Sequence, residues 1–260
     1  MGLLRDISHY WTEQLDPRVA DLPFIASSYQ VPLIIFAYLY FVLVCGPRFM
    51  KNRSPYSLET FMKLYNIVQI VGNGWLLYDC INVGLFSCEL ICPVFDYSSM
   101  RFVKNAYYYF LLKILDCVET GIFILRKKDN QVSVLHLYHH VSTLFLTWAA
   151  VRYYIVVPMI FISMLNIFIH TIMYTYYFLA AYGSNVQKAI APMKRWITIA
   201  QMVQFVMIIL YTSHPLILGC KIVNNWIIII FITDVVINFS LFYNFYQKTY
   251  KKSRKAKSKL

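Results

Sequence analysis

The sequence predicts an all-α polytopic membrane protein of a single domain, with seven transmembrane helices. Hydrophobic residues make up 59% of the 260 residues and aromatic residues 18%, whereas only 14% are charged. A soluble domain would carry about 25% charged residues. Seven apolar stretches also approach the roughly 20 residues that a helix needs to cross a bilayer. These observations exclude an ordinary soluble enzyme.

The same composition predicts no separate soluble module, so residues 1–260 are expected to form one membrane domain. The spans cover about residues 28–46, 62–84, 105–125, 132–150, 155–181, 196–216 and 224–246. The fifth is long enough to tilt or to extend beyond the lipid. The N-terminal stretch lacks the apolar core and small-residue cleavage site of a signal peptide, so the first span is expected to direct insertion.

Basic residues set the expected orientation of these spans. Most of the 24 Lys and Arg residues fall after the first, third and fifth spans and in the tail, residues 247–260. Loops rich in Lys and Arg remain in the cytosol. The N-terminus is therefore expected on the lumenal side and the C-terminus in the cytosol. The basic tail is interpreted as a solvated end that touches anionic headgroups. Its residues Lys255, Lys257 and Lys259 loosely resemble a retrieval signal, and the endoplasmic reticulum membrane is the location expected from them.

Six cysteines do not have the spacing of a metal site. Three of them, Cys88, Cys92 and Cys220, fall in loops expected on the non-cytosolic side, where disulfides persist. We therefore consider a disulfide between Cys220 and either Cys88 or Cys92 as a hypothesis.

The chemistry of the chain is expected to centre on His136-Leu-Tyr-His139-His140 in the fourth span. Positions i, i+3 and i+4 lie on one face of a helix. Burying three imidazoles costs free energy unless each finds a partner, and leucine would serve a purely structural role. Ionisable residues inside a membrane usually mark function. His136, His139 and His140, with His170 of the fifth span, are therefore the candidate catalytic residues.

Polar residues in the neighbouring spans are expected to surround the histidines. Lys113, Asp116 and Glu119 share one face of the third span, and the first two are spaced to pair. One reading is a structural ion pair that fixes helix packing, and the other is a network that orients the imidazoles. The remaining candidates for substrate binding are Asn166, Tyr174 and Tyr177 in the fifth span, Gln201 and Gln204 in the sixth, and the basic cluster Arg126, Lys127 and Lys128 at the cytosolic mouth.

Two other classes of protein would also place histidines in a membrane. Di-iron desaturases and hydroxylases use histidine boxes, but they draw on eight or more histidines, whereas this chain has six. A seven-span lipid receptor or transporter could bind a ligand through the polar stripes without chemistry. The chain has no evident internal repeat and only 8 glycines to interrupt helices, which disfavours a transporter.

Four motifs, taken in order, resemble those of the ELO family of very-long-chain fatty acid elongases, in a member of the animal or insect type. The stretch from Lys113 to Thr120 is similar to KxxExxDT, with the two acids exchanged at Asp116 and Glu119. The histidine motif matches HxxHH. The other two matches are NxxxHxxMYxYY from Asn166 to Tyr177 and TxxQxxQ from Thr198 to Gln204.

The resemblance implies a 3-oxoacyl-CoA synthase, which condenses malonyl-CoA with a long-chain acyl-CoA by decarboxylation, without a metal or another cofactor. It also implies an inverted barrel of spans two to seven around an acyl-CoA tunnel. By analogy His139 and His170 would take up the acyl group, and His136 and His140 would orient it or stabilise an enolate. Membrane lipid, other enzymes of the elongation cycle and a second copy of the chain are candidate partners, and nucleic acid is not.

Overall fold

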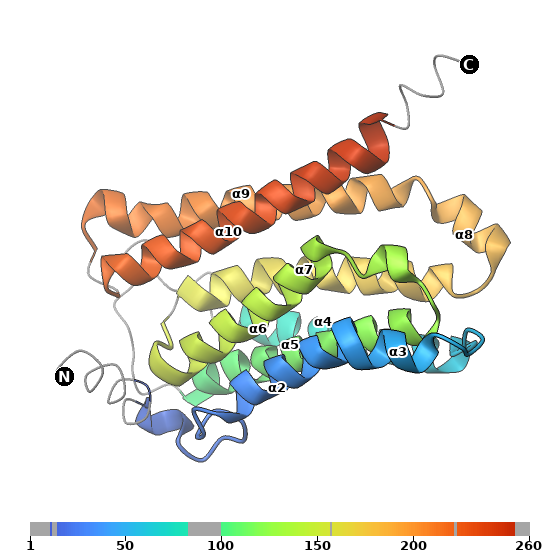
Figure 1. The fold of residues 1–260 in the computed structure, drawn as a ribbon. Coiled ribbons are helices and arrows are strands. Elements are labelled where there is room, and N and C mark those ends of the chain that lie inside the picture. Colours follow the sequence, from blue (N-terminus) through green and yellow to red (C-terminus); the bar gives the residue numbers. More distant parts are fainter. Residues whose placement is uncertain (1–10, 12–14, 83–99, 157, 221–222, 253–260) are drawn as a thin grey trace.

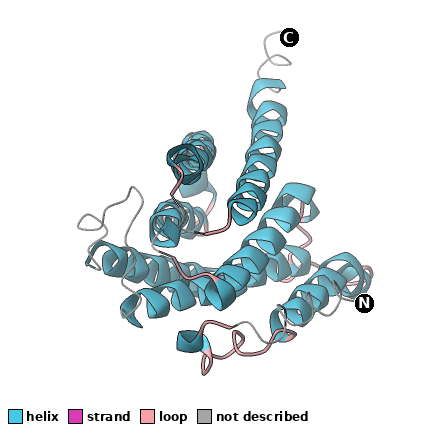
Figure 2. Cartoon of the chain, turned by 90° about the vertical axis from the view of Figure 1, so that its left-hand side faces the viewer, coloured by secondary structure: helices cyan, strands magenta, loops and turns pink. Residues whose placement is uncertain are grey.

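The computed structural model describes residue 11 and residues 15–82, 100–156, 158–220 and 223–252. Within these residues all regular secondary structure is helical (Figure 2). The predicted all-α class is therefore confirmed.

Seven helical segments follow the predicted spans in order, with ends that shift by a few residues. The first is a continuous rod of α2 (Gln30–Tyr40), the π-helical turn η2 (Phe41–Cys45) and α3 (Gly46–Met50). The others are α4 (Glu59–Asn82), α5 (Met100–Leu125), α6 (Val134–Tyr153), α7 (Pro158–Ala180), α9 (Met193–Leu218) and α10 (Asn225–Tyr246). A short helix that the sequence analysis did not predict, α8 (Ser184–Ile190), connects α7 to α9.

Four of these segments are long and apolar enough to cross a membrane: Gln30–Met50, Pro158–Ala180, Met193–Leu218 and Asn225–Lys251. The chain is thus a multi-pass membrane protein. The helices α4, α5 and α6 fall outside this group and carry many of the buried polar side chains. The count of seven spans and the inverted barrel therefore remain predictions.

The helices pack mainly in pairs. Helix α4 lies along α7, α9 along α10, and α5 against α6 (Figure 1). Helix α6 also contacts α10, and α7 contacts both α5 and α9. Consequently α6, which carries the histidine motif, lies between α5 on one side and α10 on the other.

The segment before α2 packs against the end of α6. Buried Arg152 donates hydrogen bonds to the backbone carbonyl groups of Ile25 and Ala26, and Nε1 of Trp148 donates to the carbonyl of Phe24 at 3.2 Å. Asp16 begins the short helix η1 (Pro17–Val19), and its hydrogen bond to the Arg18 guanidinium holds the pKa of the Asp16 carboxyl below its usual range. This packing fixes the segment before α2 against the end of α6.

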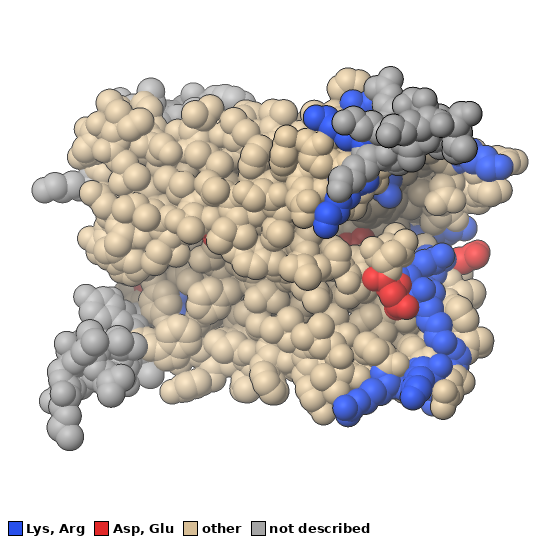
Figure 3. Space-filling model, turned by 45° about the horizontal axis from the view of Figure 1, so that its top comes forward, with Lys and Arg blue, Asp and Glu red and all other residues tan. Residues whose placement is uncertain are grey.

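Lys and Arg side chains gather at one end of the surface in Figure 3. This clustering agrees with the charge bias that predicted a cytosolic side, while the orientation itself remains a prediction. Cys220 is disulfide-bonded, but Cys88 and Cys92 lie outside the described residues, so the pairing also remains a prediction. Among the described cysteines, Cys45, Cys80 and Cys117 are free.

Candidate functional site

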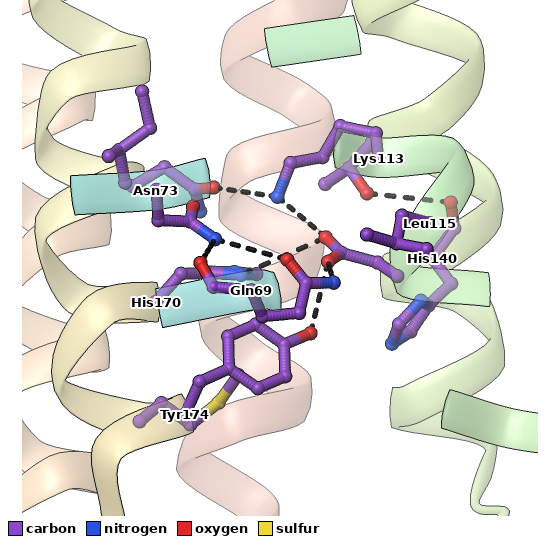
Figure 4. Close-up of polar contacts among 12 residues, drawn as sticks. Gln69, Asn73, Lys113, Leu115, His140, His170 and Tyr174 are labelled. Atoms are coloured by element: carbon purple, nitrogen blue, oxygen red, sulfur yellow. Dashed lines mark hydrogen bonds and ion pairs between the residues drawn. The ribbon is translucent and has the colours of Figure 1, made fainter. Parts of the chain in front are cut away.

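The buried carboxylate of Asp116 on α5 collects side chains from three helices. Three of these side chains, Gln69, Lys113 and Tyr174, are labelled in Figure 4. Oδ1 of Asp116 accepts hydrogen bonds from Nε2 of Gln69 on α4 at 2.8 Å and from the hydroxyl of Tyr174 on α7 at 3.0 Å. Its Oδ2 accepts one from Nζ of Lys113 at 2.8 Å. A buried charge is tolerated when it is paired and hydrogen-bonded, as it is here. The predicted pair between Lys113 and Asp116 is therefore present.

The second acceptor for Lys113 is Asn166 of α7. Nζ of Lys113 lies 2.9 Å from Oδ1 of Asn166, and the hydroxyl of Tyr109 donates to the same oxygen at 3.0 Å. Since both partners donate, Oδ1 of Asn166 is held toward α5. The motifs of the third and fifth spans therefore meet in one network.

His170 lies beside this network without joining it by a hydrogen bond. Its Nδ1 is 3.7 Å from Oδ2 of Asp116, which exceeds hydrogen-bond distance. Nδ1 is buried and has no hydrogen-bond partner among the described residues. The His170 imidazole also contacts the ring of Tyr174, with centroids 5.7 Å apart.

The three histidines of α6 point at two different neighbours. His136 faces α5, where its Nε2 lies 2.9 Å from Oγ1 of Thr120, and its ring is 4.2 Å from that of His140. His139 instead faces α10, with Nδ1 3.1 Å from Oδ1 of Asn238. The three histidines thus lie on an inward face of α6, as predicted. One side of that face packs against α5 and the other against α10.

Glu119 of α5 lies close to His136 and His140. One ligand atom from each of Glu119, His136 and His140 lies within 4.8 Å of the others, so these three residues could hold one metal ion. Two imidazoles and a carboxylate are ligands that zinc and iron both accept. His139 and His170 are not part of this cluster.

An apolar cavity of about 790 Å³ lies beside the polar network and is lined by α5, α6, α7, α9 and α10. His139 forms part of its wall, together with Asn166 and Gln204. The cavity then runs past Thr212 to the segments that join α6 to α7 and α9 to α10, where Trp226 lines it. Among the four candidate histidines, His139 alone lines this cavity.

The other predicted site residues lie outside the hydrogen-bonded network of Asp116. Tyr177 stacks edge to face on Tyr174, with ring centroids 6.1 Å apart, and Nε2 of Gln201 lies 3.7 Å from the sulfur of Met173. Nη1 of Arg126 contacts the sulfur of Met62 at 2.6 Å, while Lys127 and Lys128 are exposed in the loop before α6.

Several polar residues of the site were not predicted. Gln69, Asn73 and Tyr65 of α4 form a hydrogen-bonded row that ends on Asp116. Asp234 and Asn238 of α10 reach the histidine motif. A spacing of four residues between polar groups inside an apolar span was the available signal for both sets.

The fold and the site together define a multi-pass helical membrane protein with a buried, histidine-rich polar centre beside an apolar cavity. The chain belongs to the GNS1/SUR4 family, abbreviated ELO, whose family model matches residues 23–258. The resemblance predicted from the four motifs is thereby confirmed.

Curated relatives match over most of this chain. A very long chain fatty acid elongase of Aedes aegypti is 34% identical over an alignment of 264 residues. The alignment covers 99% of this chain and 73% of that protein. Very long chain fatty acid elongase 4 of Homo sapiens is 34% identical and covers 95% of this chain and 80% of its own length. Very long chain fatty acid elongase 1 of Mus musculus is 32% identical, with 98% and 93% covered.

Proposed function

We propose that this protein is the condensing enzyme of fatty acid elongation, a 3-oxoacyl-CoA synthase. It would join a long-chain acyl-CoA to malonyl-CoA and release CoA and carbon dioxide. Its location would be the endoplasmic reticulum membrane, with seven spans, a lumenal N-terminus and a cytosolic C-terminus. Spans two to seven would form the inverted barrel that the family resemblance implies.

The observation that carries this proposal is the position of His139 on the wall of the apolar cavity. A cavity with little polar surface suits a hydrocarbon chain, because burying apolar surface is favourable. Neutral imidazole can act as a nucleophile near pH 7. An acyl chain in the cavity would bring its thioester to His139, so the geometry favours His139 over His170 as the acyl carrier.

The reaction would proceed in two transfers. Nε2 of His139 attacks the thioester carbonyl carbon, the carbon–sulfur bond breaks, and CoA leaves as a thiolate that takes a proton from water. Malonyl-CoA then loses carbon dioxide, and the electron pair of the broken carbon–carbon bond forms an enolate. The enolate carbon attacks the acyl carbonyl, the bond from carbon to Nε2 breaks, and neutral imidazole returns. No electron donor or acceptor is needed.

The remaining residues would bind and orient the substrates. His170, within reach of the Asp116 network, would serve the acyl transfer beside His139, and His136 and His140 would orient the reactants or stabilise the enolate. Asn166, Tyr174, Tyr177, Gln201 and Gln204 would position the thioester and the pantetheine arm. Arg126, Lys127 and Lys128 would bind the CoA phosphates, since guanidinium and ammonium groups pair with phosphate.

Purified protein mixed with a series of acyl-CoAs tests both transfers. Without malonyl-CoA the wild type should release one equivalent of CoA and gain the mass of one acyl group, and with malonyl-CoA it should form 3-oxoacyl-CoA. His139→Gln should abolish CoA release, while Asn130→Ala in the exposed loop should not change it. Absence of product and of CoA release across the whole series in the wild type would overturn the proposal.

A further inference from the structure

Two polar residues of α10, Asp234 and Asn238, take no part in the network around Asp116, yet they reach the histidine motif. Asn238 is buried, with 2% of its surface exposed. Its Oδ1 lies 3.1 Å from Nδ1 of His139. Both residues also line the apolar cavity.

The amide of Asn238 can have only one orientation in this environment. Its Nδ2 lies 3.1 Å from Oδ2 of Asp234 and 3.1 Å from the Asp234 backbone carbonyl oxygen. A carbonyl oxygen only accepts hydrogen bonds, so the group that faces it must be the NH₂. The hydrogen-bond network therefore assigns Oδ1 of Asn238 to the side of His139.

This orientation in turn decides which nitrogen of His139 carries the hydrogen. Because Oδ1 of Asn238 only accepts, Nδ1 of His139 must donate. In a neutral imidazole the other nitrogen then holds the free lone pair. Nε2 of His139 has no hydrogen-bond partner among the described residues, and the ring borders the cavity.

We infer that Asn238 is a positioning residue that fixes His139 as the tautomer with hydrogen on Nδ1 and so leaves the Nε2 lone pair for the acyl thioester. The catalytic half of this inference rests on the proposed function. Acylation at Nε2 leaves the hydrogen on Nδ1, so the amide oxygen would also stabilise the positive charge of the acylated ring.

Asp234 holds Asn238 in place and is itself held by α6. The hydroxyl of Tyr138, next to His139 in sequence, donates to Oδ1 of Asp234 at 2.8 Å. A chain of hydrogen bonds thus runs from His139 through Asn238 and Asp234 to Tyr138, and both of its ends lie on α6. Removing the supporting hydrogen bond of a metal-bound histidine commonly lowers activity roughly 10- to 100-fold, and we expect a similar loss for His139.

The test combines a spectroscopic and a kinetic measurement on the full chain in detergent. Nitrogen-15 NMR of protein labelled at histidine reports which ring nitrogen carries hydrogen, and comparison with His139→Gln assigns the signal. The wild type should show hydrogen on Nδ1 of His139. Asn238→Leu should lose this preference and slow the first CoA release roughly 10- to 100-fold. Thr233→Val, on an exposed face of α10, should change neither.

A conservative variant separates positioning from packing. Asn238→Gln keeps an amide whose oxygen can accept from Nδ1 of His139 and whose NH₂ can face Asp234, so it should retain the tautomer and most of the rate lost in Asn238→Leu. If Asn238→Leu does not fold, Asn238→Ala beside Asn238→Gln gives the comparison.

The inference is overturned if wild-type His139 carries its hydrogen on Nε2. It is also overturned if folded Asn238→Leu or Asn238→Ala keeps the wild-type tautomer and CoA release within about twofold, well below the loss expected for a supporting hydrogen bond. The tautomer is read without substrate. A wild type with hydrogen on Nδ1 but no CoA release would therefore overturn the proposed function and leave the orientation of His139 supported.

Discussion

Nζ of Lys113 donates a hydrogen bond of 2.8 Å to Oδ2 of Asp116, three residues later on α5, and both side chains are buried. The pair links the carboxylate that gathers Gln69 and Tyr174 to the amide of Asn166. The ion pair therefore connects α4, α5 and α7 through two buried charges, each of which stabilises the other.

Removing one member of this pair should destabilise the fold. Lys113→Met leaves Asp116 charged and unpaired in the interior, and breaking a buried pair in this way costs about 3–5 kcal/mol. Thermal unfolding in detergent measures the loss, with Lys104→Met, exposed on the same helix, as the control. Lys113→Met with Asp116→Leu should cost less than Lys113→Met alone. Equal stability of Lys113→Met and wild type would contradict this account.

The protein should be active with Asp at position 116 and Glu at position 119, the reverse of the order in the family motif. Both oxygens of Asp116 are already occupied, so the extra methylene of Asp116→Glu should overpack the site and cost about 1–3 kcal/mol. The rate of elongation in microsomes should fall at least tenfold, whereas Asp129→Glu in the exposed loop should not lower it. We expect the double variant with Glu119→Asp to remain slow. Full activity of that variant would show that the acid lengths do not matter.

A large side chain inside the cavity should shorten the products. Thr212 lines the cavity two helical turns beyond Phe205, which contacts His139, so it lies roughly 10 Å deeper along α9. Thr212→Trp should shift the product distribution to shorter chains and leave turnover of the shortest accepted acyl-CoA nearly unchanged. Leu210→Trp, on an exposed face of α9, is the matched control. An unchanged distribution in Thr212→Trp would place the acyl chain elsewhere.

Chelation tests the expectation that no metal takes part. The condensation is an acyl transfer followed by decarboxylation, so EDTA and 1,10-phenanthroline should leave the rate within twofold, with a known metalloenzyme assayed in parallel. Loss of activity that one metal restores would instead assign that metal to Glu119, His136 and His140, whose ligand atoms already lie close together. It would also favour the alternative class considered from the sequence, the di-iron desaturases and hydroxylases.

Much of the fold and the site was predictable, because regular patterns along one helix carry the information. Apolar stretches about 20 residues long placed every long helix to within a few residues. The spacing of three between Lys113 and Asp116 predicted their pair, since these positions are neighbours on a helix surface. The ordered motifs identified the family. Helix α8 and the packing of residues 15–29 on α6 were missed, because neither has a strong periodic signal.

The sequence by itself determined the helices, the family and which polar residues share a helix face. Only the tertiary structure decided which faces meet: that α6 lies between α5 and α10, so that His136 and His140 approach Glu119 while His139 faces Asn238. It alone gave Asp234 its partners and placed His139, but not His170, on the cavity wall. Periodicity fixes directions around one helix axis. The azimuth and depth at which two helices pack depend on side chains far apart in the chain, which no local pattern contains.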